Sequence, residues 1–444
     1  MKHYLTWVIL IASLGLLSAQ NESFTLQEAI NYALTNNADI RISQNNIKDA
    51  DQQIIERRAS GLPQLNGTVS YNHFAILPIT VLPEQFALDP STGKPNPNFD
   101  RNVKFGVKNN LTGTLALSTL LFDGSYLVGL QAARDYKVYV NKELTAKQYD
   151  VKNQVIMAYM PVLLINLGVE TLDKNIANLQ KLSNDTREIF KQGFAEQLDI
   201  DRLDLSLSNL TSERDNLLRQ KQSALNYLKF IMNYPVSKNL EINDNLASFD
   251  TKASETAISG KIAYETRPEY DVIKKALDLN ELNVKLNKAG YLPTLSAFAN
   301  YQYIIQGDKL FSGASSSPTF ILGGQLSIPI FDSFMKKAKI NRAKIQSLNA
   351  VEQKNVFERS VDLEVSNARN NFINANERLA NQKKNIALAE KIYETTQTKY
   401  KNGLGSSLEI TQAEQSLYAT QQQYNQALYD VIVANFNLDK AIGK

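Results

Sequence analysis

The sequence predicts a mainly α-helical chain that also contributes strands to a transmembrane β-barrel, built as two copies of one unit. Short motifs recur in the same order about 210 to 230 residues apart, which indicates an internal duplication. Residues 62–65 (LPQL) return at 292–295 (LPTL), 122–124 (FDG) at 331–333 (FDS), and 190–193 (FKQG) at 400–403 (YKNG). Each copy reads as a helix, a strand pair, a long helix, a glycine turn and a helix. Period-two strands behind an export signal predict the barrel.

Residues 1–20 have the features of a secretory signal peptide. One positive charge is followed by an apolar run to Leu17 and then by Ser18, Ala19 and Gln20, so cleavage is expected after residue 19 or 20. The exported chain would then keep a single histidine, His73, and the sequence contains no cysteine. We therefore expect no disulfide framework, no thiolate nucleophile and no histidine-rich metal site.

The charge balance and hydropathy exclude two further classes. Lys and Arg number 48 against 45 Asp and Glu, and no basic block stands out, so we expect no nucleic-acid partner. The most apolar stretch after the signal, residues 155–169, is shorter than the roughly 18 to 20 residues of a spanning helix and contains Pro161 and Asn166. An exported protein without a spanning helix would have to enter a membrane with strands.

Segments in both copies alternate between apolar and polar residues. The alternation covers residues 104–122 in the first copy, and residues 295–305 and 320–330 in the second. A half-buried sheet in a soluble domain would also alternate. The length of these strands, beyond the usual five or six residues, and the Tyr and Phe near their ends favour a membrane barrel. The strand hairpins are expected at about 63–122 and 293–331.

Two hairpins supply too few strands to close a barrel. Membrane barrels begin at about eight strands, and an open edge in lipid would leave backbone groups unpaired at several kcal/mol each. Several chains must therefore share one barrel, with eight strands from two chains or twelve from three.

The helices are longer than a compact domain needs. Residues 125–192 contain one proline, Pro161, and residues 333–402 contain neither proline nor glycine. A continuous helix of about 65 residues would extend close to 100 Å. A periplasmic coiled coil would explain such helices alone, whereas beside a shared barrel they suggest a water-lined tube. Pro161 should kink or break the first long helix.

A glycine turn ends each long helix, at Gly193 and Gly403, and a new helix follows within a few residues. Ser406 and Glu409 fit a capping box, and Asp199 is a first-turn acid. The acids at 199, 201 and 204 lack a His or Cys beside them, and helical spacing directs Asp201 away from the other two, so we expect no metal, no cofactor and no enzyme activity.

These elements divide the chain into four expected segments: a signal peptide at 1–20, a first repeat at 21–235, an equatorial connector at 236–265 and a second repeat at 266–444. The helical hairpin tips are expected near residue 193 in the first repeat and near residue 403 in the second.

The chain resembles the TolC family of outer-membrane efflux proteins over essentially its whole mature length. The resemblance rests on residues 24–30 (FTLQEAI), 267–269 (RPE), the two LPxL strand entries and the two glycine-turn segments, the second continuing into 409–414 (EITQAE). Each motif is weak alone, and their duplication in order makes the match specific.

The resemblance implies a homotrimer in the outer membrane of a Gram-negative bacterium, contacting outer-membrane lipid. Its barrel would have twelve strands, four from each chain, continuous with a long α-helical barrel in the periplasm. The tunnel would narrow at the glycine turns and open when a periplasmic adaptor docks under control of an inner-membrane transporter. The expected function is passive transport through the exit duct of an efflux pump. Alternatives are the exit channel of a type I protein secretion system and a periplasmic coiled-coil adaptor or structural protein.

The resemblance also implies roles for individual residues. Acids at the constriction would be Asp199 and Glu409, and Tyr400 would help hold the inner hairpin closed. The adaptor would dock at the hairpin tips, formed by Gly193, Phe194, Gly403, Leu404 and Gly405. The chain departs from the family pattern at Gly405, where an arginine can form closing ion pairs, and at Gln412, where a second acid ring can stand.

Overall fold

The chain folds into two compact units. The computed structural model describes residues 22–444 except 89–90, 95, 97–98, 105 and 310–312, so the expected signal peptide lies outside the described residues. One unit, the helical unit, comprises the chain up to residue 48 together with residues 138–276 and 350–444. The other, the sheet unit, comprises residues 49–137 and 277–349.

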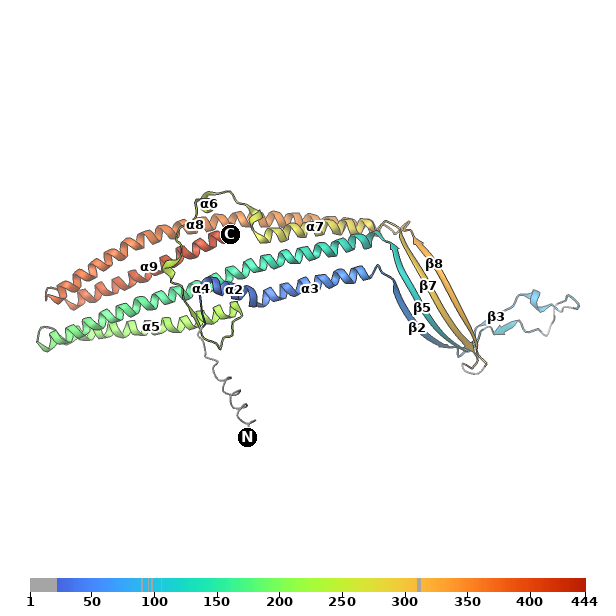
Figure 1. The fold of residues 1–444 in the computed structure, drawn as a ribbon, viewed down its shortest axis with the longest axis horizontal. Coiled ribbons are helices and arrows are strands. Elements are labelled where there is room, and N and C mark those ends of the chain that lie inside the picture. The colour runs from blue at the N-terminus through green and yellow to red at the C-terminus, as the bar shows by residue number, and fades with distance from the viewer. Residues whose placement is uncertain (1–21, 89–90, 95, 97–98, 105, 310–312) are drawn as a thin grey trace, which may run out of the picture. The chain divides into compact units, whose positions relative to one another are not determined.

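The sheet unit is organised around one antiparallel sheet of four strands in the order β2-β5-β7-β8 (Figure 1). The strands are β2 (Gln64–His73), β5 (Asn109–Phe122), β7 (Thr294–Gly307) and β8 (Ser315–Ser327). Each copy supplies two of them, and β5 joins β7 where the copies meet. Within the described part of the chain, the outer strands β2 and β8 each have a partner on one side only.

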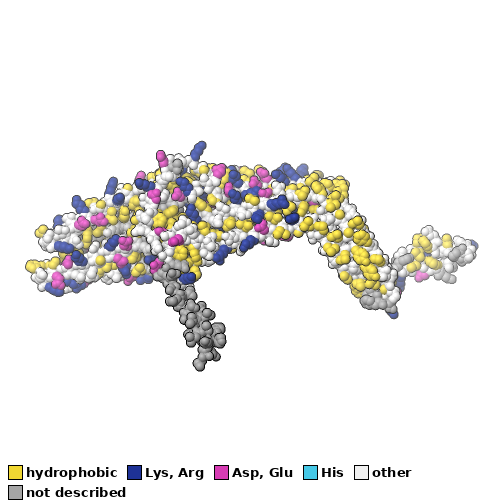
Figure 2. All heavy atoms as spheres, in the orientation of Figure 1, with side chains coloured by type: hydrophobic (Ala, Val, Ile, Leu, Met, Phe, Trp, Pro, Cys, Tyr) yellow, Lys and Arg dark blue, Asp and Glu magenta, His cyan; other side chains and the backbone are white. Residues whose placement is uncertain are grey.

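The register of the sheet separates two faces of different polarity. Leu65, Leu117, Ala299 and Leu322 lie opposite one another across all four strands. The alternate positions are mainly polar and include Asn66, Thr114, Gln302 and Thr319, which lie on the other face. Hydrophobic side chains cover the strands in Figure 2, whereas charged side chains gather on the helices. The alternation read from the sequence is therefore one apolar face and one polar face.

Two strand limits differ from the sequence prediction. The pattern predicted one strand over residues 104–122, but β5 begins at Asn109, and β4 (Asn102–Lys104) pairs instead with β3 (Ile79–Val81). Gly106 lies between β4 and β5 at φ 120°, a backbone conformation that suits glycine and changes the direction of the chain. In the second copy the pattern ran to residue 330, whereas β8 ends at Ser327. The 3₁₀ helix η1 (Glu84–Ala87) lies in the connection between β3 and β4.

Glycine has a packing role on the polar face of the sheet. Gly323 pairs with Phe298 across β8 and β7. A Cβ atom added at Gly323 would stand 2.7 Å from Cζ of the Phe298 ring. The ring therefore occupies the space that any larger residue at 323 would need.

Corresponding helices of the two copies have nearly equal lengths. The pairs are α3 (Ala38–Ala59) and α7 (Pro268–Ala289), both of 22 residues; α4 (Gly124–Lys191) of 68 and α8 (Met335–Lys401) of 67; and α5 (Gln197–Met232) of 36 and α9 (Ser407–Ala441) of 35. The long helices and the duplication are confirmed. Helix α4 continues through Pro161, so of the two predicted effects the break is wrong and the kink stays a prediction.

The core of the helical unit lies where α4, α5 and α9 pack against the start of the chain. Helix α2 (Leu26–Asn36) begins with a capping box between Thr25 and Glu28. Next to it, β1 (Glu22–Phe24) pairs in parallel with β6 (Leu240–Ile242). The buried Tyr159 of α4 donates from its hydroxyl to Asp244 Oδ2 and to the Phe24 carbonyl, each at 2.9 Å. These contacts connect the β1 end of the described chain to the middle of α4.

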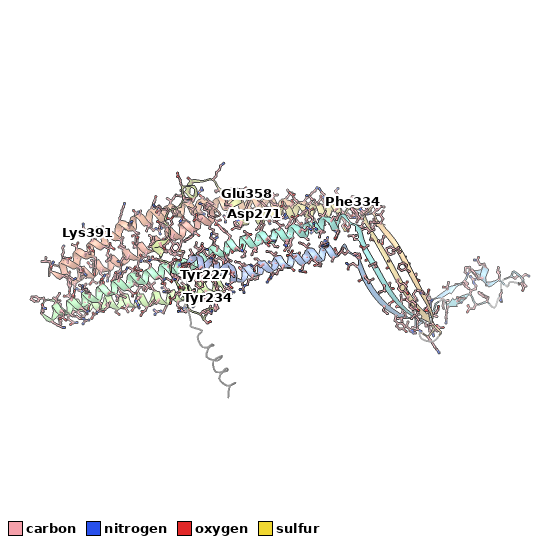
Figure 3. All side chains as sticks on the ribbon, viewed as in Figure 1. Tyr227, Tyr234, Asp271, Phe334, Glu358 and Lys391 are labelled. Carbon is pink, nitrogen blue, oxygen red and sulfur yellow. The ribbon has the colours of Figure 1, made fainter. Side chains whose placement is uncertain are left out.

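The segment expected as a connector, residues 236–265, contains β6, η2 (Leu246–Ser248), α6 (Glu255–Ser259) and the start of η3 (Tyr264–Thr266). Just after it, buried Arg267 forms an ion pair with Glu364 of α8 at 2.6 Å. The Tyr270 hydroxyl donates to Glu358 Oε1 at 2.9 Å, and Glu358 and Asp271 are labelled in Figure 3 where α7 and α8 run together. The second copy thus begins with polar contacts between α7 and α8.

One stretch of α4 is long and apolar enough to cross a membrane by length and composition, and it alone qualifies among the described helices. The sequence predicts no spanning helix here, because residues 155–169 are shorter than a span, so this prediction differs from the structure. Several side chains of the stretch, Val155, Tyr159 and Leu163 among them, are buried against other elements of the helical unit. The stretch therefore serves as a core helix of that unit.

Candidate functional site

The two helical hairpins end in the same backbone turn. Gly193 has φ 82° and Gly403 has φ 70°. In the first tip, Gly193 N donates to the Phe190 carbonyl at 2.9 Å and Phe194 N to the Ile189 carbonyl at 3.1 Å. The second tip repeats this pair of bonds one copy later. This is the Schellman arrangement, which satisfies the last carbonyls of a helix and favours glycine at the left-handed position.

The helices that return from the tips both begin with a capping box, formed by Ser406 and Glu409 in α9 and by Glu196 and Asp199 in α5. In α9, Glu409 N donates to Ser406 Oγ at 3.2 Å, and Ser406 N donates to Glu409 Oε2 at 3.4 Å, so the predicted capping box is present. In α5, Asp199 Oδ2 accepts from Glu196 N at 3.0 Å. Both candidate gate acids therefore stabilise a helix start. Glu409 is exposed and Asp199 is half-buried.

The second tip approaches its own helix closely at Gly405. A Cβ atom added there would lie 3.2 Å from Tyr400 N and 3.4 Å from Glu409 Oε2. A larger residue would require these neighbours to move by a few tenths of an ångström. The space at this position therefore fits glycine better than the arginine that the resemblance implies.

A small apolar cluster packs the two hairpins together just behind the tips. It consists of Leu179 and Leu182 of α4, Leu203 of α5 and Ile410 of α9, with Tyr400 and Tyr393 of α8 packed against it; we call this cluster the tip junction. Its four aliphatic members are at most 1 % exposed. The junction joins all four long helices within a single chain.

Tyr400 reaches across this junction to the first hairpin. Its hydroxyl lies 3.3 Å from Thr186 Oγ1, within hydrogen-bond distance. Burial raises the pKa of Tyr400, the bond with Thr186 lowers it, and the nearby charge of Asp199 raises it. Phe190 is the matching residue of the first tip, has no hydroxyl and is 39 % exposed. Of the two equivalent aromatic residues, only Tyr400 packs into the junction.

Polar contacts also connect the hairpins at the tips. Arg202 of α5 donates to Ser407 Oγ of α9 at 3.0 Å, and Lys401 of α8 lies 3.9 Å from Asp185 of α4. These pairs join the same two hairpins that the apolar cluster joins. Without an arginine at 405, the tips are held by hydroxyl bonds, a weak ion pair and apolar packing.

The three acids of α5 do not converge on one point. Asp199 caps its helix, Asp201 accepts from Gln197 at 2.8 Å, and Asp204 pairs with Arg187 and accepts from Ser183. Across the part of the chain that the structure describes, no group of three or more His, Cys, Asp or Glu could hold a metal ion. These acids cap a helix or bond to neighbouring side chains.

Sequence reasoning missed several residues at the tips. Thr186, Arg202 and Ser407 carry the contacts between the hairpins, and none stood out in the sequence because their partners are about 200 residues away. Glu414 was quoted only as part of a motif, yet it is 2 % exposed. Its position four residues after Ile410 and three before Leu417 could have revealed an acid on the apolar face of α9.

A comparison with known families finds a match over the second copy and beyond. The model of the family described as outer membrane efflux protein matches residues 261–444. A Brucella suis protein named outer membrane efflux protein BepC is 24 % identical over 453 aligned residues, covering 100 % of this chain and 90 % of that protein. The chain is thus similar to outer membrane efflux proteins along its whole length.

Other outer membrane efflux proteins match along almost the whole chain. The outer membrane protein TolC of Vibrio cholerae is 23 % identical and covers 97 % of this chain and 93 % of its own length. A crystal structure of CusC has a TM-score of 0.73 at 20 % identity, covering 95 % of this chain and 92 % of that one. The fold class expected from the resemblance is confirmed.

Proposed function

We propose that three copies of this chain form the outer-membrane exit duct of a tripartite efflux pump, through which small molecules pass passively from the pump to the exterior. The four-stranded sheet supports this function most directly. Its one apolar face suits lipid and its polar face suits a water-filled lumen. Its outer strands β2 and β8 each have one neighbour, so a second copy can pair with each free edge.

The proposed partners are a periplasmic adaptor and an inner-membrane transporter that supplies the energy. The tips offer an apolar contact for the adaptor, because Phe194 and Leu404 are 82 % and 81 % exposed at equivalent positions. The backbone turns next to Phe194 and Leu404 at Gly193, Gly403 and Gly405. A soluble coiled-coil adaptor would not need a sheet with two faces, so this alternative is disfavoured.

The proposed gate consists of Asp199, Tyr400 and Glu409. Three copies of the exposed Glu409 near one axis would concentrate cations and hinder anions. Tyr400 would hold α8 against α4 through Thr186, 3.3 Å away. Opening would then require the hairpins to separate at the tips.

Membrane fractionation with native mass measurement tests the assembly. We expect the chain in the outer-membrane fraction and a mass of about three chains after mild detergent extraction. A monomer recovered in the soluble periplasmic fraction would contradict the duct.

Glu409→Ala and Glu409→Gln test the gate in planar bilayers. Glutamine keeps an acceptor for Ser406 N and removes the charge, so the pair of variants separates capping from electrostatics. We expect both variants to raise the cation concentration that halves the current by about tenfold. The exposed Glu390→Gln of α8 is the control and should leave the block unchanged. An unchanged block in both Glu409 variants removes Glu409 from the gate.

A further inference from the structure

Glu414 is a buried carboxyl group in the packed side of α9. It is 2 % exposed and lies one helical turn beyond Ile410 of the tip junction. Its Oε1 accepts from the Tyr418 hydroxyl at 3.0 Å, whereas its Oε2 has no hydrogen-bond partner among the described residues. An acid with one neutral donor and one unpartnered oxygen is poorly arranged to hold a negative charge.

Among the residues that the structure describes, the groups around Glu414 supply no compensating charge. Tyr393 of α8 and Tyr418 of α9 are the titratable groups whose pKa responds to Glu414. The sides of α4 and α5 that meet the junction contribute Leu179, Leu182 and Leu203. The charged residues of the same region bond elsewhere: Arg187 to Asp204, Arg202 to Ser407 and Lys401 to Asp185.

Burial therefore favours the neutral form of the carboxyl group. It raises the pKa of Glu414 from 4.5 to about 7, and the hydrogen bond from Tyr418 lowers it in part. A value near 7 means that modest changes of periplasmic pH alter the charge inside the packed helices. Glu409, exposed at the cap of the same helix, lacks this burial.

We propose that Glu414 is a proton-operated lock on the tip junction: the neutral side chain keeps α9 packed against the first hairpin, and its ionisation loosens the hairpins and favours opening of the tunnel. The inference rests on the proposed duct, because it assigns a control to the tips of that duct. The lock lies behind the gate residues and needs no contact with solutes in the tunnel.

The direction follows from the two protonation equilibria. A loosened tip returns the carboxyl group to water, where its pKa is the ordinary 4.5, while the packed tip holds it near 7. The packed tip therefore binds the proton more tightly. Its extra stabilisation is complete below pH 4.5, is lost as the pH rises to 7, and changes little above that. Between pH 5 and 7 the ratio of loosened to packed tips should rise by about 40-fold.

Hydrogen exchange on the full-length assembled protein in lipid nanodiscs tests the lock without requiring conduction. Exchange of the α8 and α9 backbone at the tips is measured at pH 5, 6, 7 and 8 and corrected for the intrinsic pH dependence of exchange. We expect opening of the native tips to increase by about 40-fold between pH 5 and 7. Glu414→Gln keeps the size and the acceptor for Tyr418, and should stay at the protected level throughout.

Two further variants make the test specific. Glu394→Gln removes an exposed carboxyl group of α8 and should keep the native pH dependence. Tyr418→Phe removes the bond that favours the charged form of Glu414, so the midpoint should move to higher pH. A purely structural role of Glu414 would not move this midpoint, and the variant decides the matter even if Glu414→Gln does not assemble.

Single-channel conductance over the same pH range separates the lock from the duct. We expect the open probability of the native channel to rise with pH and that of Glu414→Gln to stay low. The lock would be overturned if hydrogen exchange at the native tips does not change with pH, or if Glu414→Gln keeps the native pH dependence of exchange. It would also be overturned if the channel conducts and its tips respond to pH but its open probability does not. If no variant conducts, the duct is contradicted and the exchange data still decide whether Glu414 controls packing.

Discussion

The two hairpin tips share a backbone turn and differ in several of the side chains that surround it. Both use a left-handed glycine and the same pair of closing hydrogen bonds. The first tip pairs Arg187 with Asp204 and leaves Phe190 partly exposed. The second places Tyr400 in the junction and buries Glu414 without a counter-charge. The backbone turn is the same in both copies, because few backbone conformations can end a helix in this way. The packing of the surrounding side chains differs between the copies.

The two tips differ in how the charges of their acidic residues are compensated. In the first, Asp204 has a nearby cation and a hydroxyl donor, so its charge is compensated in the chain itself. In the second, Glu409 is exposed and Glu414 is buried with only a tyrosine donor. Uncompensated acids respond to cations and to protons, whereas paired ones respond weakly. The proposed lock and most of the proposed gate therefore lie in the second tip.

Truncation of the shared apolar core should have the largest effect. Leu203→Ala and Ile410→Ala remove fully buried side chains from opposite hairpins, and each should lower the local stability of the tips by about 2–5 kcal/mol. Hydrogen exchange of the tip helices measures this loss. Leu404→Ala is the control, because that side chain is 81 % exposed and should change the stability by less than about 0.5 kcal/mol. An effect confined to the mutated hairpin would show that the core is not shared.

Replacement of the turn glycines should have an intermediate and equal effect. Gly193→Ala and Gly403→Ala place a Cβ atom in a left-handed conformation, which costs about 1–2 kcal/mol at each site. Neither Cβ atom would meet a neighbour within 4 Å, so the backbone alone decides the cost. Asparagine at the same positions is the control and should be tolerated better. Clearly unequal losses, measured by hydrogen exchange of the two turns, would break the equivalence of the tips.

Removal of the Tyr400 hydroxyl should have the smallest effect on stability. Tyr400→Phe keeps the ring in the junction and loses the bond with Thr186, a cost of about 0.5–1.5 kcal/mol. We expect a higher closed-state leak in bilayers. Phe190→Tyr adds the hydroxyl to the tip that lacks it and serves as the matched control, with no expected change in leak. Additive losses in Tyr400→Phe and Thr186→Val would contradict a direct bond between the two side chains.

Local patterns predicted most of the elements and failed at particular points. Alternation located the strands because their side-chain period is independent of their partners, but it extended β5 back to residue 104, where β4 pairs with β3 instead. Glycine and capping signals located the turns and the Ser406–Glu409 box. Pro161 lies within α4 without breaking it, since packing in the long helix outweighs the lost backbone bond.

The sequence by itself determined the duplication, the alternating strands, the long helices and the glycine turns, because each depends on residues close together in the chain. Only the tertiary structure decided that Tyr400 meets Thr186, that Arg202 meets Ser407, and that Glu414 is buried with an unpartnered oxygen. These contacts form between helices that are about 200 residues apart in the sequence and pack side by side in the fold. The burial of a side chain and the identity of its partner depend on that packing, which local sequence patterns do not encode.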